Sequence, residues 1–215
     1  MKNTIHITNH SNGTKMEGIQ SISTSVLKNP ICQKRSQCEG SVCAHCYASH
    51  LCSFRKSLAE NLAENYDILN DHLLTKTEAL KVNVTSVLAR IESFGDVASV
   101  TQARNYIRII RANPQSRWGI WSKNKGIWAA AFHIEGKPRN CTFVLSSEEL
   151  NEPAEVPAWL EPYVDHVFTV WDKDVYDKMW RGTESECAGI RCMSCVKCYK
   201  RKGKKTPFYI NERLR

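Results

Sequence analysis

Several common catalytic signals are missing from this chain of 215 residues. It contains no phosphate-binding loop of the form Gly-x4-Gly-Lys-[Ser/Thr], no glycine fingerprint of dinucleotide-binding folds and no Ser–His–Asp pattern. Enzymes that act on ATP or NAD are therefore disfavoured, and no serine nucleophile is indicated. Tandem repeats and low-complexity segments are missing too. The length is sufficient for a sizeable buried core without disulfides.

Long apolar segments are also absent. The first residues, from Met1 to His6, lack the apolar run of a secretory signal, and no window is apolar enough to span a bilayer. We therefore expect a cytoplasmic protein with no membrane partner. In a reducing compartment, clustered cysteines are more often metal ligands or redox groups than disulfides. The ten cysteines of this chain are interpreted in that way.

Most of the cysteines form two groups near the two ends of the chain. The first group is Cys38, Cys43 and Cys46, and the second is Cys187, Cys192, Cys195 and Cys198. Both groups contain the spacing Cys-x4-Cys-x2-Cys. Three thiols this close in sequence can converge on one metal ion or one iron–sulfur cluster. We predict a [4Fe–4S] cluster at the first group, with a structural zinc ion as the alternative.

The second group has four thiols, which is enough to close a metal site completely. It is therefore expected to hold either a structural zinc ion or an auxiliary [4Fe–4S] cluster, giving one or two clusters in all. Cys32, Cys52 and Cys141 stand apart from these spacings. We interpret them as packing thiols.

Strand-like and helix-like segments alternate along the chain. Strands are expected at residues 18–27, 82–92, 117–121, 141–145 and 166–170. The alternation predicts an α/β fold whose parallel sheet, of about five to six strands, is open or curled into a partial (β/α) barrel. Residues 1–180 would form this domain, and residues 181–215 a small C-terminal cysteine-rich module. Residues 1–16 would form an edge strand or a loose arm.

The ends of several elements carry local signals. Asn29-Pro30 is expected to end the first strand, and Ser53 to cap a helix that continues to residue 73. Ser99 or Thr101 is expected to cap a second helix. The inner face of that helix would be Ala103, Tyr106, Ile107 and Ile110.

Parallel α/β folds bind ligands where the carboxyl ends of the strands open into loops. This chain places its polar groups there: the cysteine loop, residues 92–96, Ser122-Lys123, residues 146–148 and residues 172–173. We therefore expect these groups to converge on one rim of the sheet. The candidate cofactor-binding residues are Ser93, Gly95, Asp96 and Lys123.

A cysteine triplet in the loop after the first strand resembles the radical S-adenosylmethionine enzymes. In that superfamily three cysteines bind a [4Fe–4S] cluster, and the fourth iron takes the amino and carboxylate groups of the cofactor. Gly95-Asp96 resembles the family's glycine-rich turn, whose carboxylate holds the methionine amino group. The resemblance implies an enzyme that uses S-adenosylmethionine, with Asp96 as a cofactor anchor and with its catalytic residue and substrate left open.

A second resemblance spans nearly the whole chain. It rests on Lys15-Met16-x-Gly18, the Cys46-Tyr47-Ala48 box, Arg90-x4-Gly95-Asp96, Trp121-Ser-Lys123-Asn124 and the closing Cys-x2-Cys-x2-Cys-Tyr199. In these motifs the chain is similar to the phage and gut-bacterial gene product 88 family. The resemblance implies a phage-related protein and supplies no mechanism of its own.

The formal net charge of +8 indicates an anionic partner. Part of the excess lies in one segment: Lys197, Lys200, Arg201, Lys202, Lys204 and Lys205. Aromatic residues flank this segment, which is typical of sites that hold single-stranded nucleic acid. A solvated tail explains the pattern equally well. The alternative function is therefore a non-catalytic zinc or iron–sulfur protein that binds nucleic acid.

Overall fold

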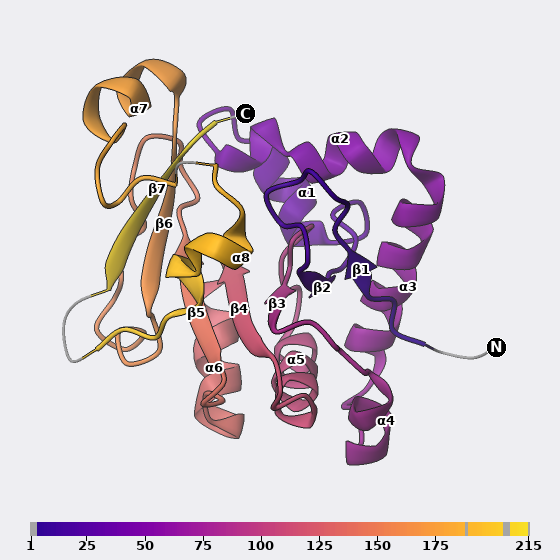
Figure 1. Cartoon of the computed structure of the whole chain (residues 1–215). Helices are drawn as coiled ribbons and strands as arrows, with labels where there is room; N and C mark the ends of the chain where they lie inside the picture. The colour runs from indigo at the N-terminus through magenta and orange to yellow at the C-terminus, as the bar shows by residue number, and fades with distance from the viewer. Residues whose placement is uncertain (1–3, 188, 204–206, 215) are drawn as a thin grey trace.

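Seven strands form a single sheet in the order in which they occur in the chain (Figure 1). The computed structural model describes residues 4–187, 189–203 and 207–214. The strands are β1 (Thr8–Asn9), β2 (Gln20–Ile22), β3 (Leu88–Ile91), β4 (Arg117–Ser122), β5 (Cys141–Ser146), β6 (His166–Trp171) and β7 (Phe208–Arg213). β1 is antiparallel to β2, and every other neighbouring pair is parallel. The predicted α/β class and parallel sheet are confirmed, and the sheet is not a closed barrel.

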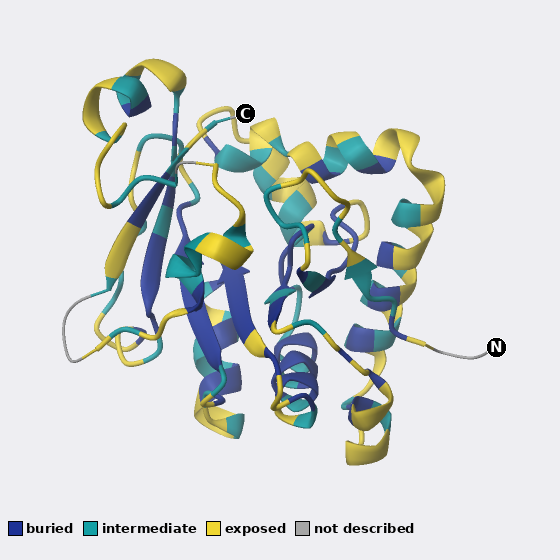
Figure 2. Ribbon diagram, viewed as in Figure 1, coloured by how far each residue is buried: buried dark blue, intermediate teal, exposed yellow. Residues whose placement is uncertain are grey.

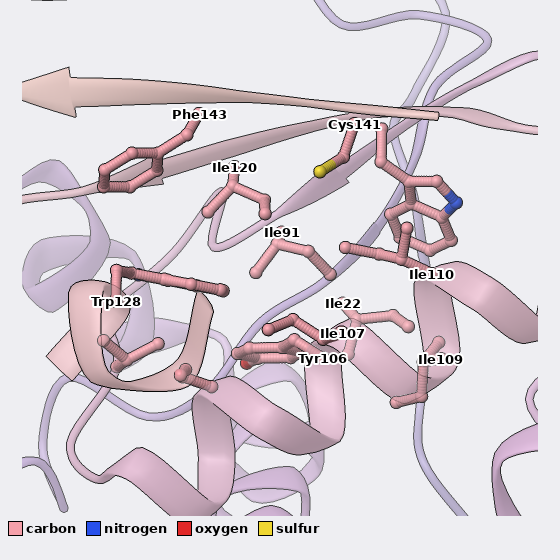
Figure 3. Packing of buried hydrophobic residues seen from close by; sticks show 14 of the residues in the cluster. Ile22, Ile91, Tyr106, Ile107, Ile109, Ile110, Ile120, Trp128, Cys141 and Phe143 are labelled. Carbon is pink, nitrogen blue, oxygen red and sulfur yellow. The ribbon is translucent and has the colours of Figure 1, made fainter. Parts of the chain in front are cut away.

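The sequential strand order places the connecting helices on one face of the sheet. Parallel crossovers are right-handed, so the connections from β2 to β3, from β3 to β4 and from β4 to β5 send their helices to the same side. These helices are α3 (Lys56–Asp71), α4 (Lys76–Lys81), α5 (Val100–Ala112) and α6 (Lys125–Glu135). Part of the connection from β6 to β7 is the exception and lies on the opposite face. Figure 3 shows side chains of the sheet, such as Ile120 and Phe143, packed against Tyr106, Ile107 and Trp128 of the helices.

The predictions for α5 are confirmed. Ala103, Tyr106, Ile107 and Ile110 are all fully buried against the sheet. The Ser99 hydroxyl accepts a hydrogen bond from the backbone N–H of Gln102, 3.1 Å away, and so caps the helix.

The opposite face of the sheet is covered by the C-terminal segment. Here α8 (Cys192–Cys195) and η2 (Lys197–Tyr199) lie across β4 and β5 (Figure 1). Tyr199 packs with Trp121 and Val144 in a second apolar cluster. Figure 2 shows the strands beneath as buried, whereas α8 itself is largely exposed. Since β7 extends the same sheet, the module expected at residues 181–215 is joined to it directly; its boundary at residue 180 stays a prediction.

The cysteine loop contains helices that the sequence reading did not anticipate: α1 (Pro30–Ser36), η1 (Val42–His45) and α2 (Tyr47–Phe54). The expectation that Asn29-Pro30 ends a strand is wrong. β2 ends at Ile22, and Asn29 caps α1 by accepting from the N–H of Ile31, with Pro30 as the first helical residue. The same two residue types suit a strand end and a helix start.

Two other boundaries differ from the expectation. Ser53 lies inside α2, and α3 begins after Arg55 without a side-chain cap, so the predicted Ser53 cap is wrong. The strand expected at 82–92 is limited to β3, and the C-terminal β7 adds a strand. α7 (Lys173–Met179) begins after Asp172, whose carboxylate accepts from the N–H of Val175.

Substitution of Gly119 tests how closely the C-terminal segment packs on the sheet. A Cβ atom there would lie 3.0 Å from the ring of Tyr199 and closer still to that of Trp121. We expect Gly119→Ala to lower the free energy of unfolding by about 1–3 kcal/mol, because both rings are buried and cannot move aside. Urea unfolding under reducing conditions measures this. The control is Gly126→Ala in α6, where the added methyl meets open space; equal losses in both variants would contradict the packing described.

Candidate functional site

The carboxyl ends of the parallel strands form a polar rim, and Asp96 lies at its centre. Its carboxylate accepts hydrogen bonds from the Ser122 hydroxyl at 2.5 Å and from the backbone N–H of Lys123 at 2.9 Å. The N–H of Val97 donates to the same group at 2.8 Å. Only 6% of Asp96 is exposed. Because a buried carboxylate is costly without donors, these bonds tie the loop after β3 to the end of β4.

Arg35 fastens the cysteine loop to this rim. Its guanidinium lies 3.4 Å from the Asp96 carboxylate and 3.1 Å from that of Glu148. The loop is held a second time by its backbone, since the N–H of Val42 donates to the carbonyl of Glu148 at 2.9 Å. The predicted convergence on one rim is therefore seen for the cysteine loop, residues 92–96, Ser122-Lys123 and Glu148. Residues 172–173, also expected there, begin α7, where Asp172 bonds to Asn151 and Val175.

Ser93 and Gly95 form the turn that precedes Asp96. The Ser93 hydroxyl lies 2.8 Å from that of Ser21 and 3.0 Å from that of Ser23, and all three are buried. Gly95 has a φ of +83°, and a Cβ atom there would lie 2.6 Å from the carbonyl oxygen of Thr24. Only glycine fits this position without displacing the backbone beside it.

The four candidate cofactor-binding residues thus lie together, but the contacts just described are with the protein itself. For Lys123 the contact to Asp96 comes from the backbone N–H. Tyr47, directly after Cys46, donates its hydroxyl to the carbonyl of Ser93. The turn and the cysteine loop are consequently in direct contact.

Glu92, expected as the last residue of the strand before this turn, has no predicted role. It is buried with a φ of +55°, and its carboxyl group accepts from Thr24 N–H at 3.0 Å, Gln102 at 3.0 Å and the Tyr106 hydroxyl at 2.5 Å. Burial raises the pKa of Glu92 to about 8, although the hydrogen bonds from Tyr106 and Thr24 oppose the shift. At neutral pH this side chain is mostly uncharged. Its one sequence signal is a carboxylate at the end of an apolar strand.

The first group of thiols lies around α1 and η1. Cys43 and Cys46 are half-buried, and Cys38 is exposed with its Sγ 3.8 Å from the carbonyl of Lys34. Cys32 also belongs to this neighbourhood. Burial raises the pKa of its thiol, and negative charge on Asp96, Glu92, Cys43 and Cys46 raises the pKa further. The structure therefore places Cys32, which was interpreted as a packing thiol, near two of the predicted ligands.

The second group is assembled from both ends of the chain. The Lys15 ammonium lies 2.8 Å from Cys187 Sγ and 2.6 Å from the Glu212 carboxylate. Burial alone would lower the pKa of Lys15, but Glu212 and Cys187 outweigh burial and raise the pKa. The backbone N–H of Cys192 donates to the carbonyl of Lys15 at 2.8 Å. Lys15 was predicted only as part of a family motif, and no local pattern in the sequence indicates its contact with Cys187.

Negative charges would oppose one another within the second group. Burial raises the pKa of the Cys198 thiol, and Cys187, Cys192 and Cys195 raise the pKa further. A metal cation relieves such repulsion, so the donor chemistry fits a metal or cluster. No group of three His, Cys, Asp or Glu side chains in the described ranges is already arranged to hold a metal ion. Ligation would require the thiols to turn towards a shared point.

Comparison with known proteins places the chain in a family. A family model described as gene product 88 matches residues 1–211. The chain belongs to the gene product 88 family. Neither the search of curated proteins nor that of solved structures found a match. Membership of gene product 88 confirms the second resemblance, whereas the likeness to radical S-adenosylmethionine enzymes stays a prediction.

Two further expectations concern the exterior of this gene product 88 protein. None of the helices in the described residues is long and apolar enough to cross a membrane. Of the basic residues predicted to bind nucleic acid, Lys204 and Lys205 lie outside the described residues. The other four lie on or directly after η2.

Arg90 links the rim to the second thiol group. Its guanidinium stacks on Trp121, 4.1 Å from the ring centre, on the face of the sheet that Tyr199 and Cys198 cover. Burial lowers the pKa of His10 to about 4, and the positive charge of Arg90 contributes to the shift. The same charge opposes the rise in the pKa of Cys198. Arg90 therefore favours thiolate at the second group and a neutral His10.

Glu92 gives the stability of this protein a distinct pH dependence. Its pKa is raised from 4.5 to about 8 in the fold, so between these values the unfolded chain releases the proton first. Wild-type stability therefore falls as pH rises through this range. We expect the stability of Glu92→Gln, relative to wild type, to increase from pH 5 to pH 8, because Gln cannot ionise. Urea unfolding at both pH values measures this. If the difference in unfolding free energy between the two proteins does not change with pH, the pKa of Glu92 is not raised in the fold.

Proposed function

We propose that this protein is an iron–sulfur enzyme of the radical S-adenosylmethionine type. Cys38, Cys43 and Cys46 would hold a [4Fe–4S] cluster, and the second thiol group an auxiliary cluster or a zinc ion. One observation carries the proposal: Arg35 holds the cysteine loop against Asp96 and Glu148 at the carboxyl ends of the parallel strands. That edge is where parallel α/β folds place their chemistry.

The charges around the loop support a cluster with an open ligand position. The raised pKa of Glu92 reduces its negative charge at neutral pH, and Arg35 offsets the charge of Asp96. The repulsion that these two carboxyl groups exert on nearby thiolates is therefore weakened. When bound, a cluster of this type supplies one electron to the sulfonium of S-adenosylmethionine.

The protein's own residues would position and shield the cofactor. Asp96 is the candidate acceptor for the cofactor's amino group, and its bonds to Ser122 and Lys123 fix the direction of its carboxylate. Ser93 and Gly95 shape the turn so closely that no side chain fits at Gly95. Arg35, bound to both Asp96 and Glu148, keeps the loop over the rim.

The second thiol group supports a closed site. Cys192 and Cys198 pack against the apolar cluster that contains Tyr199 and Trp121, and the Lys15 ammonium binds Cys187 Sγ. Four thiolates are enough to fill the coordination sphere of a metal ion, as expected for a structural zinc or an electron-relaying cluster. Metal analysis distinguishes these two outcomes.

Metal content tests the loop assignment directly. We expect anaerobically purified protein to contain iron and sulfide, and Cys43→Ser and Cys46→Ser to lose about four irons each, because a serine hydroxyl replaces a thiolate poorly at neutral pH. Iron, sulfide and zinc are measured on the same preparations. The matched control is Cys141→Ala, a buried core thiol whose loss leaves both groups intact. Unchanged metal content in both serine variants, or a colourless wild-type protein that contains zinc, would contradict the assignment of a cluster to this loop.

The third ligand is identified by two further variants in the same measurement. Cys38→Ser is expected to lose the cluster and Cys32→Ser to retain it, because the exposed Cys38 is free to turn whereas burial disfavours the Cys32 thiolate. Loss of iron in Cys32→Ser but not in Cys38→Ser would identify Cys32 as the third ligand.

Cofactor binding tests Asp96. In the reconstituted protein, Asp96→Asn is expected to keep its iron and to lose S-adenosylmethionine affinity by roughly tenfold or more, because a charge-assisted hydrogen bond becomes a neutral one. Isothermal titration calorimetry gives the dissociation constants. Ser122→Ala is the comparison: it keeps the carboxylate and removes one of the hydrogen bonds that fix its direction, so a smaller loss of affinity is expected. The absence of S-adenosylmethionine binding to wild type, or equal losses in the two variants, would refute this role.

A further inference from the structure

A pocket of about 730 Å³ lies at the amino ends of the central strands, at the opposite edge of the sheet from the cysteine loop. Its walls come from the residues that lead into β3, β4 and β5 and from the segment around η2. Four cationic residues line it: Arg117, Arg139, Lys200 and Arg201. The volume is in the range of pockets that bind small ligands.

The positive charge of this pocket is not compensated within the described residues. No Asp or Glu of the described part lines the pocket, and no ion pair there joins its four cations to a carboxylate. All four side chains are exposed. Asp165, which binds the N–H of Lys202, is itself paired with Lys137. An anion entering the pocket would therefore meet four cations that no carboxylate of the described residues pairs with.

The segment that carries two of these cations is held in place by its backbone. The Thr142 hydroxyl donates to the carbonyl of Cys198 at 2.7 Å, and His166 Nε2–H donates to that of Lys200 at 2.7 Å. The N–H of Lys202 donates to Asp165 at 3.2 Å. These bonds place Lys200 and Arg201 beside the two arginines before any ligand arrives, which lowers the entropic cost of binding.

One wall of the pocket is apolar. Val87 is 68% exposed and Met193 is 38% exposed, and Leu88 and Val196 lie beside them in the lining. Sites for inorganic phosphate need only donors and positive charge. An exposed apolar wall next to several cations suits a ligand that has both a charged phosphate and a flat apolar base.

We propose that this pocket binds nucleotides, with the four cations contacting phosphate and the apolar wall contacting a base. The phosphates come either from a free nucleotide or from a single strand, and both have the same local chemistry. The site does not depend on the cluster proposed at the cysteine loop, because it lies at the other edge of the sheet and uses none of the rim residues.

The test uses the full chain and a fluorescently labelled twelve-nucleotide single strand, with fluorescence anisotropy read across a salt series. We expect Arg117→Ala/Arg139→Ala and Lys200→Ala/Arg201→Ala each to weaken binding roughly tenfold or more, and to reduce the slope of log affinity against log salt by about 1.4. The control is Lys76→Ala/Lys81→Ala, which removes the same charge from exposed positions on α4. It should bind like wild type.

Two further controls show whether a loss of binding comes from lost charge or from a damaged fold. Arg117→Lys/Arg139→Lys keeps the positive charge and should restore most of the affinity. Thermal melting and metal content should be unchanged in all variants.

Competition experiments identify the source of the phosphate. If a mononucleotide displaces the labelled strand, and the same double substitutions abolish this effect, the ligand is a free nucleotide. If only the unlabelled oligonucleotide displaces the labelled strand, the ligand is a single strand.

Three results would overturn the proposal: equal losses of affinity in the pocket and control variants, equally strong binding of heparin, or no binding of the strand at low salt. None of these outcomes bears on the cluster, whose iron content is measured separately.

Discussion

The buried carboxylate of Asp96 is the constraint on which the rim depends. Burial at this position is tolerated because Ser122, Val97 and the N–H of Lys123 donate to the carboxylate and Arg35 compensates its charge. Ser122 and Lys123 lie at the end of β4, Val97 belongs to the turn, and Arg35 belongs to α1. The same carboxylate therefore joins the turn after β3, the end of β4 and the helix that begins the cysteine loop. Two backbone carbonyls of the turn reinforce these contacts, since the Asn29 amide donates to that of Asp96 and the Asn124 amide donates to that of Val97.

The order of the strands determines what each side of the sheet can do. Consecutive parallel strands send their helices to one face, which α5 and α6 fill with a large apolar core. The other face is left to the returning C-terminal segment, where Tyr199 and Cys198 cover Trp121 and Arg90. This arrangement separates three sites: the cysteine loop at the carboxyl edge, the second thiol group on the face, and the basic pocket at the amino edge.

Several local features could be read from the sequence because they depend on neighbours within one element. The alternation of strands and helices, the Ser99 cap and the buried face of α5 follow from short-range periodicity and hydrogen bonding. Boundaries were less secure where one signal has two meanings, as at Asn29-Pro30, which suits both the end of a strand and the start of a helix. Family membership was also visible in the motifs, because spacing is preserved in the sequence itself.

By itself, the sequence determined the class of fold, the family, the two cysteine groups and the collection of polar residues at the strand ends. Tertiary structure alone decided which of these residues meet. Cys32 lies near Cys43 and Cys46, Lys15 lies on Cys187, and Arg117 and Arg139 share a pocket with Lys200 and Arg201. The physical reason is that most of these contacts join segments far apart in the chain. They depend on the register of the sheet and on the path of the C-terminal segment across it, which no local pattern encodes.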